Sequence, residues 1–333
     1  MAQFALSTPL GYLGDVEVQM GNLAAARTYF ARSLNICEAL AAANPNSALA
    51  QRDLSLSLIR LGNLEVQTSD LATAYAYFDR SLKIREAQAA ANPNSSLAQR
   101  DIAISLKELG NVEVQMGNLV DGHAHLDRSL LISETIAAAE PSSAEAQRDL
   151  SIILRTFGDM EMLTGNPTAH AHYDRSNKIC EILAGVDPTN TQAQRDLFVS
   201  LGKVGNVEML TGNITAARTY FDRSLRVSET LANADPAGAL ASFDVVLAYL
   251  QLMNLAIREH NTAVATTHLA AARTRLDRMA QLGQVQGHAQ REAVLAGLNT
   301  ISTFKPTSRL FPLYLLLFSL ISLLVGVALL LSS

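Results

Sequence analysis

Tryptophan is absent from this 333-residue sequence, and aromatic residues of all kinds make up only 5% of it. Strands favour β-branched and aromatic side chains, so this scarcity argues against a fold built on sheets. Apolar residues nevertheless reach 49%, with Ala and Leu the commonest, and these lose little conformational freedom in a helix. The composition therefore favours a helical protein with enough apolar side chains for a buried core.

Cysteine and basic charge are also scarce. The two cysteines, Cys37 and Cys180, are too few for a disulfide framework and form no CxxC metal pair, which is typical of a cytosolic protein. The formal net charge is −5 and no cluster of Lys and Arg occurs, so the basic face that nucleic-acid binding requires is missing. Residues 1–14 hold no Lys or Arg and no long apolar run, so no secretory signal is expected.

Catalytic motifs are missing as well. The sequence contains no phosphate-binding loop, no HExxH, no GxSxG and no Cys/His nucleophile pair. We therefore expect a protein that is not an enzyme, has no cofactor and takes no small-molecule substrate.

What the sequence does contain is an internal repeat, which opens each time on a similar phrase such as LGNVEVQMGNL. The glycine of that phrase recurs at intervals of 48, 48, 48 and 47 residues, at Gly14, Gly62, Gly110, Gly158 and Gly205. A second phrase such as YFDRSLKIRE follows in each copy, and a connector such as NPNSSLAQRDI separates the copies. Five copies of one structural unit are therefore expected.

Each unit has the apolar spacing of two helices. In the second copy Leu54, Leu58 and Leu61 share one stripe, and Ala74 and Phe78 resume it after a break. Gly-Asn pairs and Asn-Pro pairs mark the breaks, because Gly permits a left-handed helix end and Asn or Asp can cap the next helix. This pattern predicts antiparallel helices of about 20 residues. The breaks are expected near residues 20, 45, 69, 93, 117, 141, 165, 188, 212 and 236.

The order of these residues resembles the tetratricopeptide repeat (TPR). In the first copy the matching residues are Leu13-Gly14, Gly21, Ala26, Phe30, Ser33 and Pro45. The usual unit has 34 residues, so 48 is a departure that resembles the lengthened variety common in bacterial repeat proteins. The resemblance covers roughly residues 2–238 and implies an all-α fold, a right-handed solenoid of helical hairpins.

The chain then divides as follows. Residues 1–47 are expected to form a degenerate N-terminal repeat, because Pro9 and Gly11 should interrupt its first helix. Four repeats follow in 48–238. Residues 239–283 should form a divergent, more polar sixth helix pair that acts as a cap, with helices over 242–260 and 262–282. Residues 284–309 should hold a linker and one short helix over 289–300.

Leu310–Leu331 is an uncharged apolar run of 22 residues. As a helix it would be about 33 Å long, enough to cross a hydrocarbon core of about 30 Å. We expect a single transmembrane helix here, and because only Ser332 and Ser333 follow, a tail anchor. Lys305 and Arg309 flank its N-terminal side, so the positive-inside rule predicts that residues 1–309 lie in the cytosol, at a bacterial inner membrane if the repeats are of the bacterial type.

Several polar residues recur once per copy, which suits packing or ion pairing between units better than catalysis. The recurring residues are Glu17, Glu65, Glu113, Glu161 and Glu208, then Arg32, Arg80, Arg128, Arg175 and Arg223, then Glu38, Glu86, Glu134, Glu181 and Glu229, and the Gln-Arg-Asp triplets of the connectors. His123, His125, His170 and His172 occupy positions that hold Arg or Tyr in other copies, so we predict no metal site. Cys37 and Cys180 should be small core residues.

In TPR domains the first helix of each unit lines a concave groove, so the resemblance implies a partner-binding site there. The exposed, copy-specific residues expected in it are Asn63, Lys107, Asn111, Arg155, Asp159, Lys203 and Asn206. Lys107 with Asn111 resembles half of the clamp by which some members hold a peptide carboxylate, but the next copy has Thr156 where the clamp uses Asn.

Two functions remain open. The first is a non-enzymatic scaffold that binds a protein or peptide at the cytosolic face of a membrane. The alternative is a regulatory or sensor subunit of a signalling system whose catalytic domain is on another chain.

Overall fold

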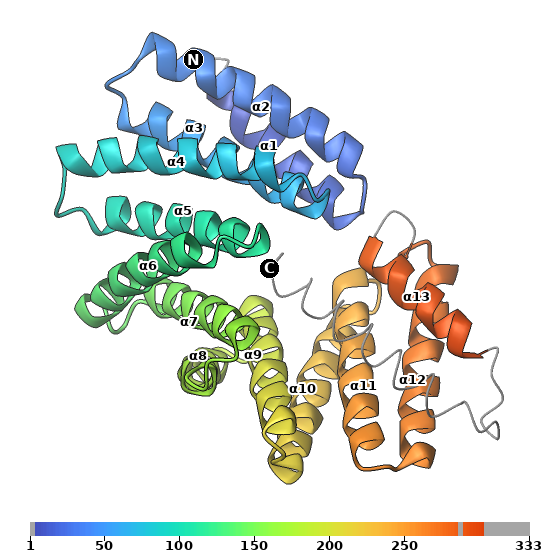
Figure 1. The fold of residues 1–333 in the computed structure, drawn as a ribbon. Helices are drawn as coiled ribbons and strands as arrows, with labels where there is room; N and C mark the ends of the chain where they lie inside the picture. Colours follow the sequence, from blue (N-terminus) through green and yellow to red (C-terminus); the bar gives the residue numbers. More distant parts are fainter. Residues whose placement is uncertain (1–3, 286–288, 303–333) are drawn as a thin grey trace. The chain divides into compact units, whose positions relative to one another are not determined.

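The helices begin and end where the repeat places its Gly, Asn and Pro residues. The computed structural model describes residues 4–285 and 289–302, and every regular element in these two ranges is an α-helix, thirteen in all (Figure 1). All ten predicted breaks fall in the intervals between these helices. The helical-hairpin expectation is therefore confirmed over the described residues.

The described chain divides into two compact units, and the boundary along the chain falls within the fourth repeat, between Asn166 and Pro167. Unit 1 holds three antiparallel hairpins and one further helix, drawn from blue to green in Figure 1. Its helices are α1 (Phe4–Gln19), α2 (Leu23–Ala43), α3 (Ala48–Gln67), α4 (Leu71–Ala91), α5 (Ser96–Gln115), α6 (Leu119–Ala139) and α7 (Ala144–Thr164).

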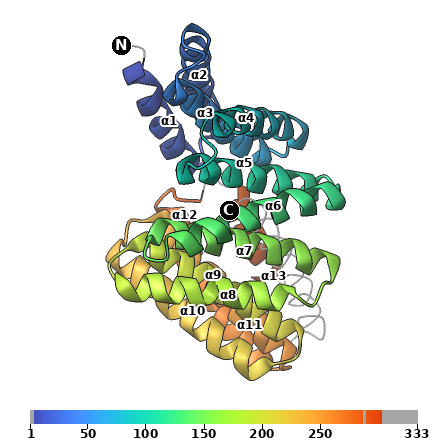
Figure 2. The ribbon, with the colours of Figure 1, turned by 90° about the vertical axis from the view of Figure 1, so that its left-hand side faces the viewer.

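Unit 2 begins with a single helix and continues with two hairpins and a shorter helix (Figure 2). Its helices are α8 (Ala169–Val186), α9 (Thr191–Leu210), α10 (Ile214–Ala234), α11 (Ala239–Arg258), α12 (Thr262–Gln281) and α13 (Ala289–Ser302). The helix predicted over residues 289–300 is thus confirmed as α13.

The hairpin turns use the left-handed backbone that the Gly-Asn pairs predict. The glycines at these turns, such as Gly21 (φ 81°) and Gly212 (φ 88°), have positive φ, and Ser69 (φ 63°) takes the same conformation where the second copy lacks the glycine. The residue after each turn was expected to cap the N-terminus of the next helix, but only some of these residues do so. Asp70 accepts a hydrogen bond from the Thr73 amide, whereas Asn22 makes no cap bond with its side chain.

Within a hairpin, a glycine on the first helix faces a large side chain on the second. A methyl group at Gly62 would overlap the ring of Phe78, and one at Gly110 would lie 2.8 Å from Cγ of Leu126. A buried serine fixes the same contact, since the Ser81 hydroxyl donates to the Ser55 carbonyl oxygen 3.2 Å away. The glycines therefore allow the paired helices to approach closely, as the sequence indicated.

Between repeats, the recurring charged residues form rows of ion pairs. One row joins second helices, where Arg80 pairs with Glu38 (2.6 Å) and Arg128 with Glu86 (2.7 Å) in unit 1. Arg223 pairs with Glu181 in unit 2 in the same register. The other row joins first helices through the connector triplets, with Arg52–Asp101, Arg100–Asp149 and Arg195–Asp244. The prediction of ion pairing between repeats is confirmed at these positions.

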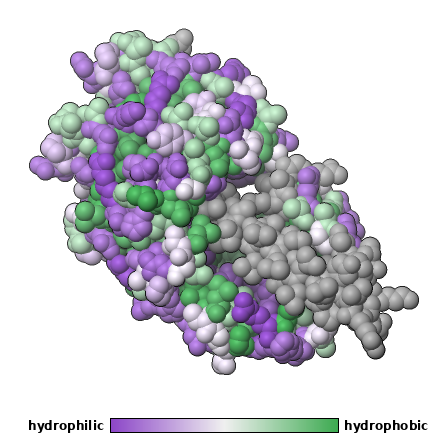
Figure 3. Space-filling model, in the orientation of Figure 1, coloured by the Kyte–Doolittle hydropathy of each residue, from purple (hydrophilic) through white to green (hydrophobic). Residues whose placement is uncertain are grey.

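On the face drawn in Figure 3, the upper region, which belongs to unit 1, mixes polar and apolar patches rather than separating them. Many of the ion pairs are at least partly exposed, as in Arg80–Glu38, so each contributes modestly to stability. The ion pairs recur in the same register from repeat to repeat, although the energy of each is small.

The first helix departs from expectation. Pro9 and Gly11 were predicted to interrupt it, but α1 runs unbroken from Phe4 to Gln19 with Pro9 inside. Gly11 is buried, where a side chain would meet Arg60, and Leu10 is buried beside it. The packing of α1 in unit 1 therefore outweighs the one backbone hydrogen bond that proline removes.

The sixth helix pair is also less polar than predicted. Helices α11, α12 and α13 share an extensive apolar core that includes Phe243, Leu250, Met253, Leu276 and Leu298. The arginines that suggested a polar cap lie mainly on α12, while α13 supplies the cover through Val294 and Leu298. A helix that closes an array needs an apolar inner face as well as a polar outer one.

One described helix, α11, is long and apolar enough to cross a membrane by length and composition. Of its most apolar stretch 67% is buried, as expected for a core helix. The predicted span Leu310–Leu331 lies outside the described residues.

Candidate functional site

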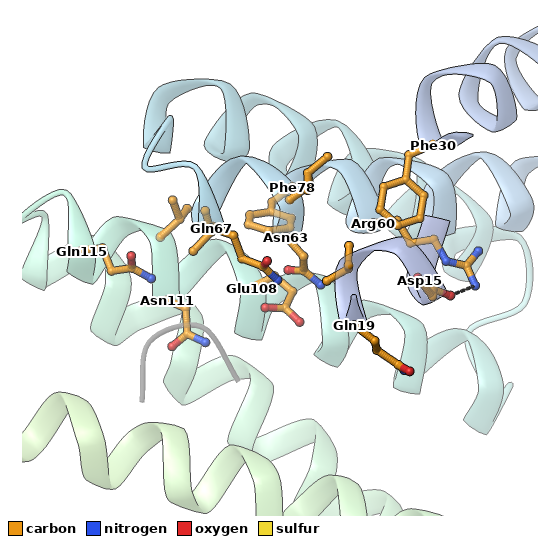
Figure 4. Close-up of a pocket in the computed structure, with 14 residues that line it drawn as sticks. Asp15, Gln19, Phe30, Arg60, Asn63, Gln67, Phe78, Glu108, Asn111 and Gln115 are labelled. Carbon is orange, nitrogen blue, oxygen red and sulfur yellow. Dashed lines mark ion pairs between the residues drawn. The ribbon is translucent and has the colours of Figure 1, made fainter. Parts of the chain in front are cut away.

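The first helices of three successive repeats enclose a groove in unit 1. The cavity measures about 420 Å³ and opens between α1, α3 and α5 (Figure 4). Phe30 and Phe78 reach it from the second helices, and the remaining lining is mainly polar. A groove at this place is what the TPR resemblance implied for the first helices.

Two rows of repeat-equivalent side chains line the groove. Asn63 and Asn111 are 48 residues apart and occupy the same place on α3 and α5, with Asp15 at that place on α1. Four residues further along each helix stand Gln19, Gln67 and Gln115. Residues i and i+4 share a helix face, so each helix directs an amide or acid and then a glutamine to the same side. Figure 4 shows Asn63, Gln67 and Glu108 in the middle of the groove, with Asn111 and Gln115 beside them.

The charged residues of the groove are paired within the protein. Arg60 lies 3.2 Å from the carboxylate of Asp15, and Lys107 lies 2.9 Å from that of Glu108. Within the part of the chain that the structure describes, no hydrogen bond is made by the side-chain amides of Asn63, Gln67 and Asn111. Neutral amides are therefore the groups that the groove offers to a ligand.

Amide side chains suit one kind of partner. Each offers a carbonyl acceptor and an NH₂ donor, which match the N–H and C=O of a peptide unit. Packed helices lie about 8–10 Å apart, close to the length of three extended residues at about 3.3 Å each. The row spacing thus suits an extended chain whose main chain meets an amide at every third residue.

A second cavity of about 250 Å³ lies between α5, α6 and α7, and Lys107 and Ser133 line it. In the preceding repeat Arg85 stands at the place of Ser133 and is fully buried. Nε of Arg85 donates to the Ser55 hydroxyl (3.0 Å), and burial lowers the pKa of this guanidinium to about 10. The serine fills less volume than the arginine does at the equivalent place.

The predicted site residues separate in the structure. Asn63 and Asn111 line the groove together, whereas Lys107 lines the second cavity. Asn206 lies half-buried on α9 of unit 2.

The expected exposure is wrong for three of these residues. Arg155 and Asp159 on α7 are each 6% exposed, and Lys203 on α9 is 4% exposed. The repeat pattern alone does not reveal the burial of these side chains. They are not surface groups that a partner meets first.

The glutamines that line the groove were not among the site residues predicted from the sequence. Gln19, Gln67 and Gln115 recur at intervals of 48 residues, and Leu163 and Leu210 replace them in the later copies. This switch from Gln to Leu was the available signal, because it marks the first three repeats as different from the rest.

The histidines lie against carboxylates rather than against one another. Nδ1 of His125 is 2.6 Å from Glu113, and Nε2 of His170 is 2.9 Å from Glu208. Among the described residues, no group of three or more His, Cys, Asp or Glu side chains could hold a metal ion. Cys37 and Cys180 are buried, as the sequence predicted for small core residues.

Comparison with known proteins yields matches of structure only. No protein-family model matches the chain, and no curated protein matches it by sequence. The solved structure of BtubC (BKLC) from P. vanneervenii is 13% identical, with 79% of this chain and 91% of that one covered and a TM-score of 0.57. The apo form of RapI is 11% identical, with 97% and 98% covered and a TM-score of 0.55.

The nuclear import adaptor Nro1 from S. pombe is 12% identical, with 96% and 99% covered and a TM-score of 0.50. At such identities the likeness shows the fold alone, a TPR-like array of helical hairpins.

Proposed function

We propose that this protein is a binding scaffold that holds an extended protein segment in the groove of unit 1, chiefly through the segment's main chain. The observation that carries the proposal is the in-register amides of α3 and α5 at Asn63, Gln67 and Asn111, beside charges already paired within the protein. Nro1, one of the similar structures, is an adaptor, which agrees with a binding role.

The chemistry sets the expected specificity. Amide groups read the peptide backbone, which every sequence shares, so recognition through them tolerates many side chains. The charges at Asp15–Arg60 and Lys107–Glu108 already satisfy one another and would give little extra affinity to a charged partner. We therefore expect broad selectivity for extended segments.

We also propose that Leu310–Leu331 attaches the protein to a membrane, with the repeats on its cytosolic side and the inner membrane of a bacterium as the expected place. The support is the length and uncharged composition of that segment together with Lys305 and Arg309 before it. The groove would then present captured segments close to a membrane surface.

Selection of 12-residue peptides from a random library against the full-length protein tests the groove. We expect selected peptides to bind at least tenfold more weakly to an Asn63→Ala/Asn111→Ala variant. Asn206→Ala, which removes the equivalent amide in unit 2, serves as the matched control and should not change binding.

Methylation of the peptide backbone gives the second arm. N-methylated versions of the selected peptides lose N–H donors and should bind weakly as well. Recognition by these amides would be refuted if the peptides bound the Asn63→Ala/Asn111→Ala variant as tightly as the unaltered protein, and if the N-methylated peptides bound as tightly as the unmodified ones.

A further inference from the structure

Among the described residues, no helix packs on the outer face of α1, although the same face is covered in every later repeat of unit 1. Leu13 is 47% exposed and Val16 is 48% exposed. Their equivalents 48 residues later, Leu61 and Leu64, are 2% and 1% exposed. We call Pro9, Leu13, Val16 and Glu17, which lie on one face of α1, the α1 edge.

The covered face of α3 shows what fits such an edge. Ala26 and Phe30 of α2 pack on Leu61 and Leu64 of α3 in one apolar cluster. Beside them Arg27 of α2 forms an ion pair with Glu65 of α3. The helix that covers α3 is thus amphipathic and carries a small residue, a basic residue next to it and an aromatic residue three positions further on.

The other end of the contact follows the same register. The Ser57 hydroxyl of α3 lies 3.3 Å from the Ser33 hydroxyl and 3.3 Å from the Cys37 sulfur of α2. Pro9 is the equivalent of Ser57 and is exposed. The α1 edge therefore corresponds in register to the α3 face along several helical turns, with proline in place of the serine at this end.

Glu17 adds a charge to the α1 edge. Two of its equivalents bind a base from the preceding helix, as Glu65 binds Arg27 in unit 1 and Glu208 binds His170 (2.9 Å) in unit 2, while Glu113 pairs with His125 of the following helix. Glu17 itself is half-buried and accepts a hydrogen bond from the Asn22 amide (2.8 Å). No basic side chain in the described ranges pairs with it.

Charge and burial narrow the choice of occupant. Helix α1 contains no Lys, Arg or His, so a second α1 edge placed against it would offer no base to Glu17. The apolar run 310–331 carries no charge that could pair with Glu17. In a second copy of the protein, Phe30 is 3% exposed within its own hairpin, so it is not available to pack on the α1 edge.

From these contacts we infer that the α1 edge is a docking surface for an amphipathic helix of a partner protein. That helix carries an Ala-Arg-x-x-aromatic face like that of α2, with its base on Glu17 and its apolar residues on Leu13 and Val16. This surface is separate from the amide groove and does not depend on the proposed function.

A synthetic peptide with the sequence of α2, residues 23–43 with blocked ends, is the probe. Fluorescence anisotropy of the labelled peptide against the full chain in mild detergent should show saturable binding. Leu13→Asp in the full chain should weaken binding at least tenfold. Leu131→Asp is the matched control, because Leu131 is 65% exposed on α6, away from the α1 edge, and should leave binding unchanged.

A charge exchange makes the test independent of any loss of folding. Glu17→Lys should weaken binding of the natural peptide at least tenfold and restore binding of a peptide that carries Arg27→Glu. The inference is overturned if no peptide binds, or if binding ignores both Leu13→Asp and the charge exchange. It is also overturned if sedimentation shows a dimer that Leu13→Asp dissociates, because a second copy would then occupy the edge.

Discussion

Single residues decide how closely the helices of a hairpin approach. Gly62 faces Phe78 and Gly110 faces Leu126, with no room for even a methyl group without movement of the partner. The sequence indicated this role because the glycine recurs within a helix, where it otherwise costs about 1 kcal/mol relative to alanine. A residue that is unfavourable locally but recurs in every copy serves a contact elsewhere.

Gly62→Ala should therefore destabilise the protein by about 1–3 kcal/mol, since the added methyl group must displace the Phe78 ring. Gly185→Ala is the matched control. A methyl group there meets nothing within 4 Å, so the change should be neutral or stabilise by up to about 1 kcal/mol. Thermal or urea unfolding measures both, and equal effects of the two changes would contradict the packing role.

Glu208 gives a pH-dependent prediction at the same scale. Hydrogen bonds from His170 and Asn213 hold the pKa of this carboxyl below its usual range. A lowered carboxyl pKa contributes stability that is present above the unfolded pKa of about 4.3 and is lost as the pH falls through the folded value.

Glu208→Gln should therefore lower stability at pH 7 by no more than about 1 kcal/mol, because the side chain of His170 is half exposed. The difference in melting temperature from the unaltered protein should shrink as the pH falls below about 4.3. A difference that stays constant from neutral to acid pH would show that the charge of Glu208 does not matter.

Whole helices follow local signals except where neighbours override them. The Gly-Asn and Asn-Pro breaks predicted the ends of helices α1–α12, because capping and left-handed turns depend on a few adjacent residues. Pro9 misled the prediction of α1, since a proline forbids one hydrogen bond but not the packing of the rest of the helix.

Pro9→Ala should accordingly stabilise α1, because alanine restores the backbone hydrogen bond that proline lacks and Pro9 is exposed. We expect a gain of about 1 kcal/mol, less than the full proline cost because proline also restricts the unfolded chain. Hydrogen exchange of the α1 amides should slow. Pro93→Ala, in the turn before α5, is the control and should give no such protection.

At the scale of the whole molecule, the helical-hairpin fold was predictable and the site only in part. The period of the sequence is enough to predict the repeats, but the burial of a side chain depends on which elements pack against its helix. Asn63 and Asn111, chosen as exposed, copy-specific residues of first helices, line the groove, whereas Arg155 and Lys203, chosen on the same grounds, are buried. The Gln row was visible as a repeat, but its place in a groove was not.

The membrane proposal is tested on the whole chain. Two changes at the centre of the apolar run, Leu317→Lys and Leu324→Lys, should oppose insertion by about 2.5–3.5 kcal/mol each and move the protein from the membrane to the soluble fraction. Deletion of residues 306–333 should do the same and leave the helical content of the repeats unchanged. Retention of either variant in washed membranes would show another attachment.

The register of the ion pairs has a consequence for how such a gene changes length. If recombination removed residues 48–95, Arg27 would meet Glu113 instead of Glu65, Glu38 would meet Arg128 instead of Arg80, and Phe30 would pack on Leu109 and Val112. The partners in the ion-pair rows have equivalents one period later, although Asp15 would face Glu108 in place of Arg60. Unequal crossing-over can therefore shorten or lengthen the array by whole copies and keep the rows of ion pairs, whereas an insertion of any other length breaks both rows at once.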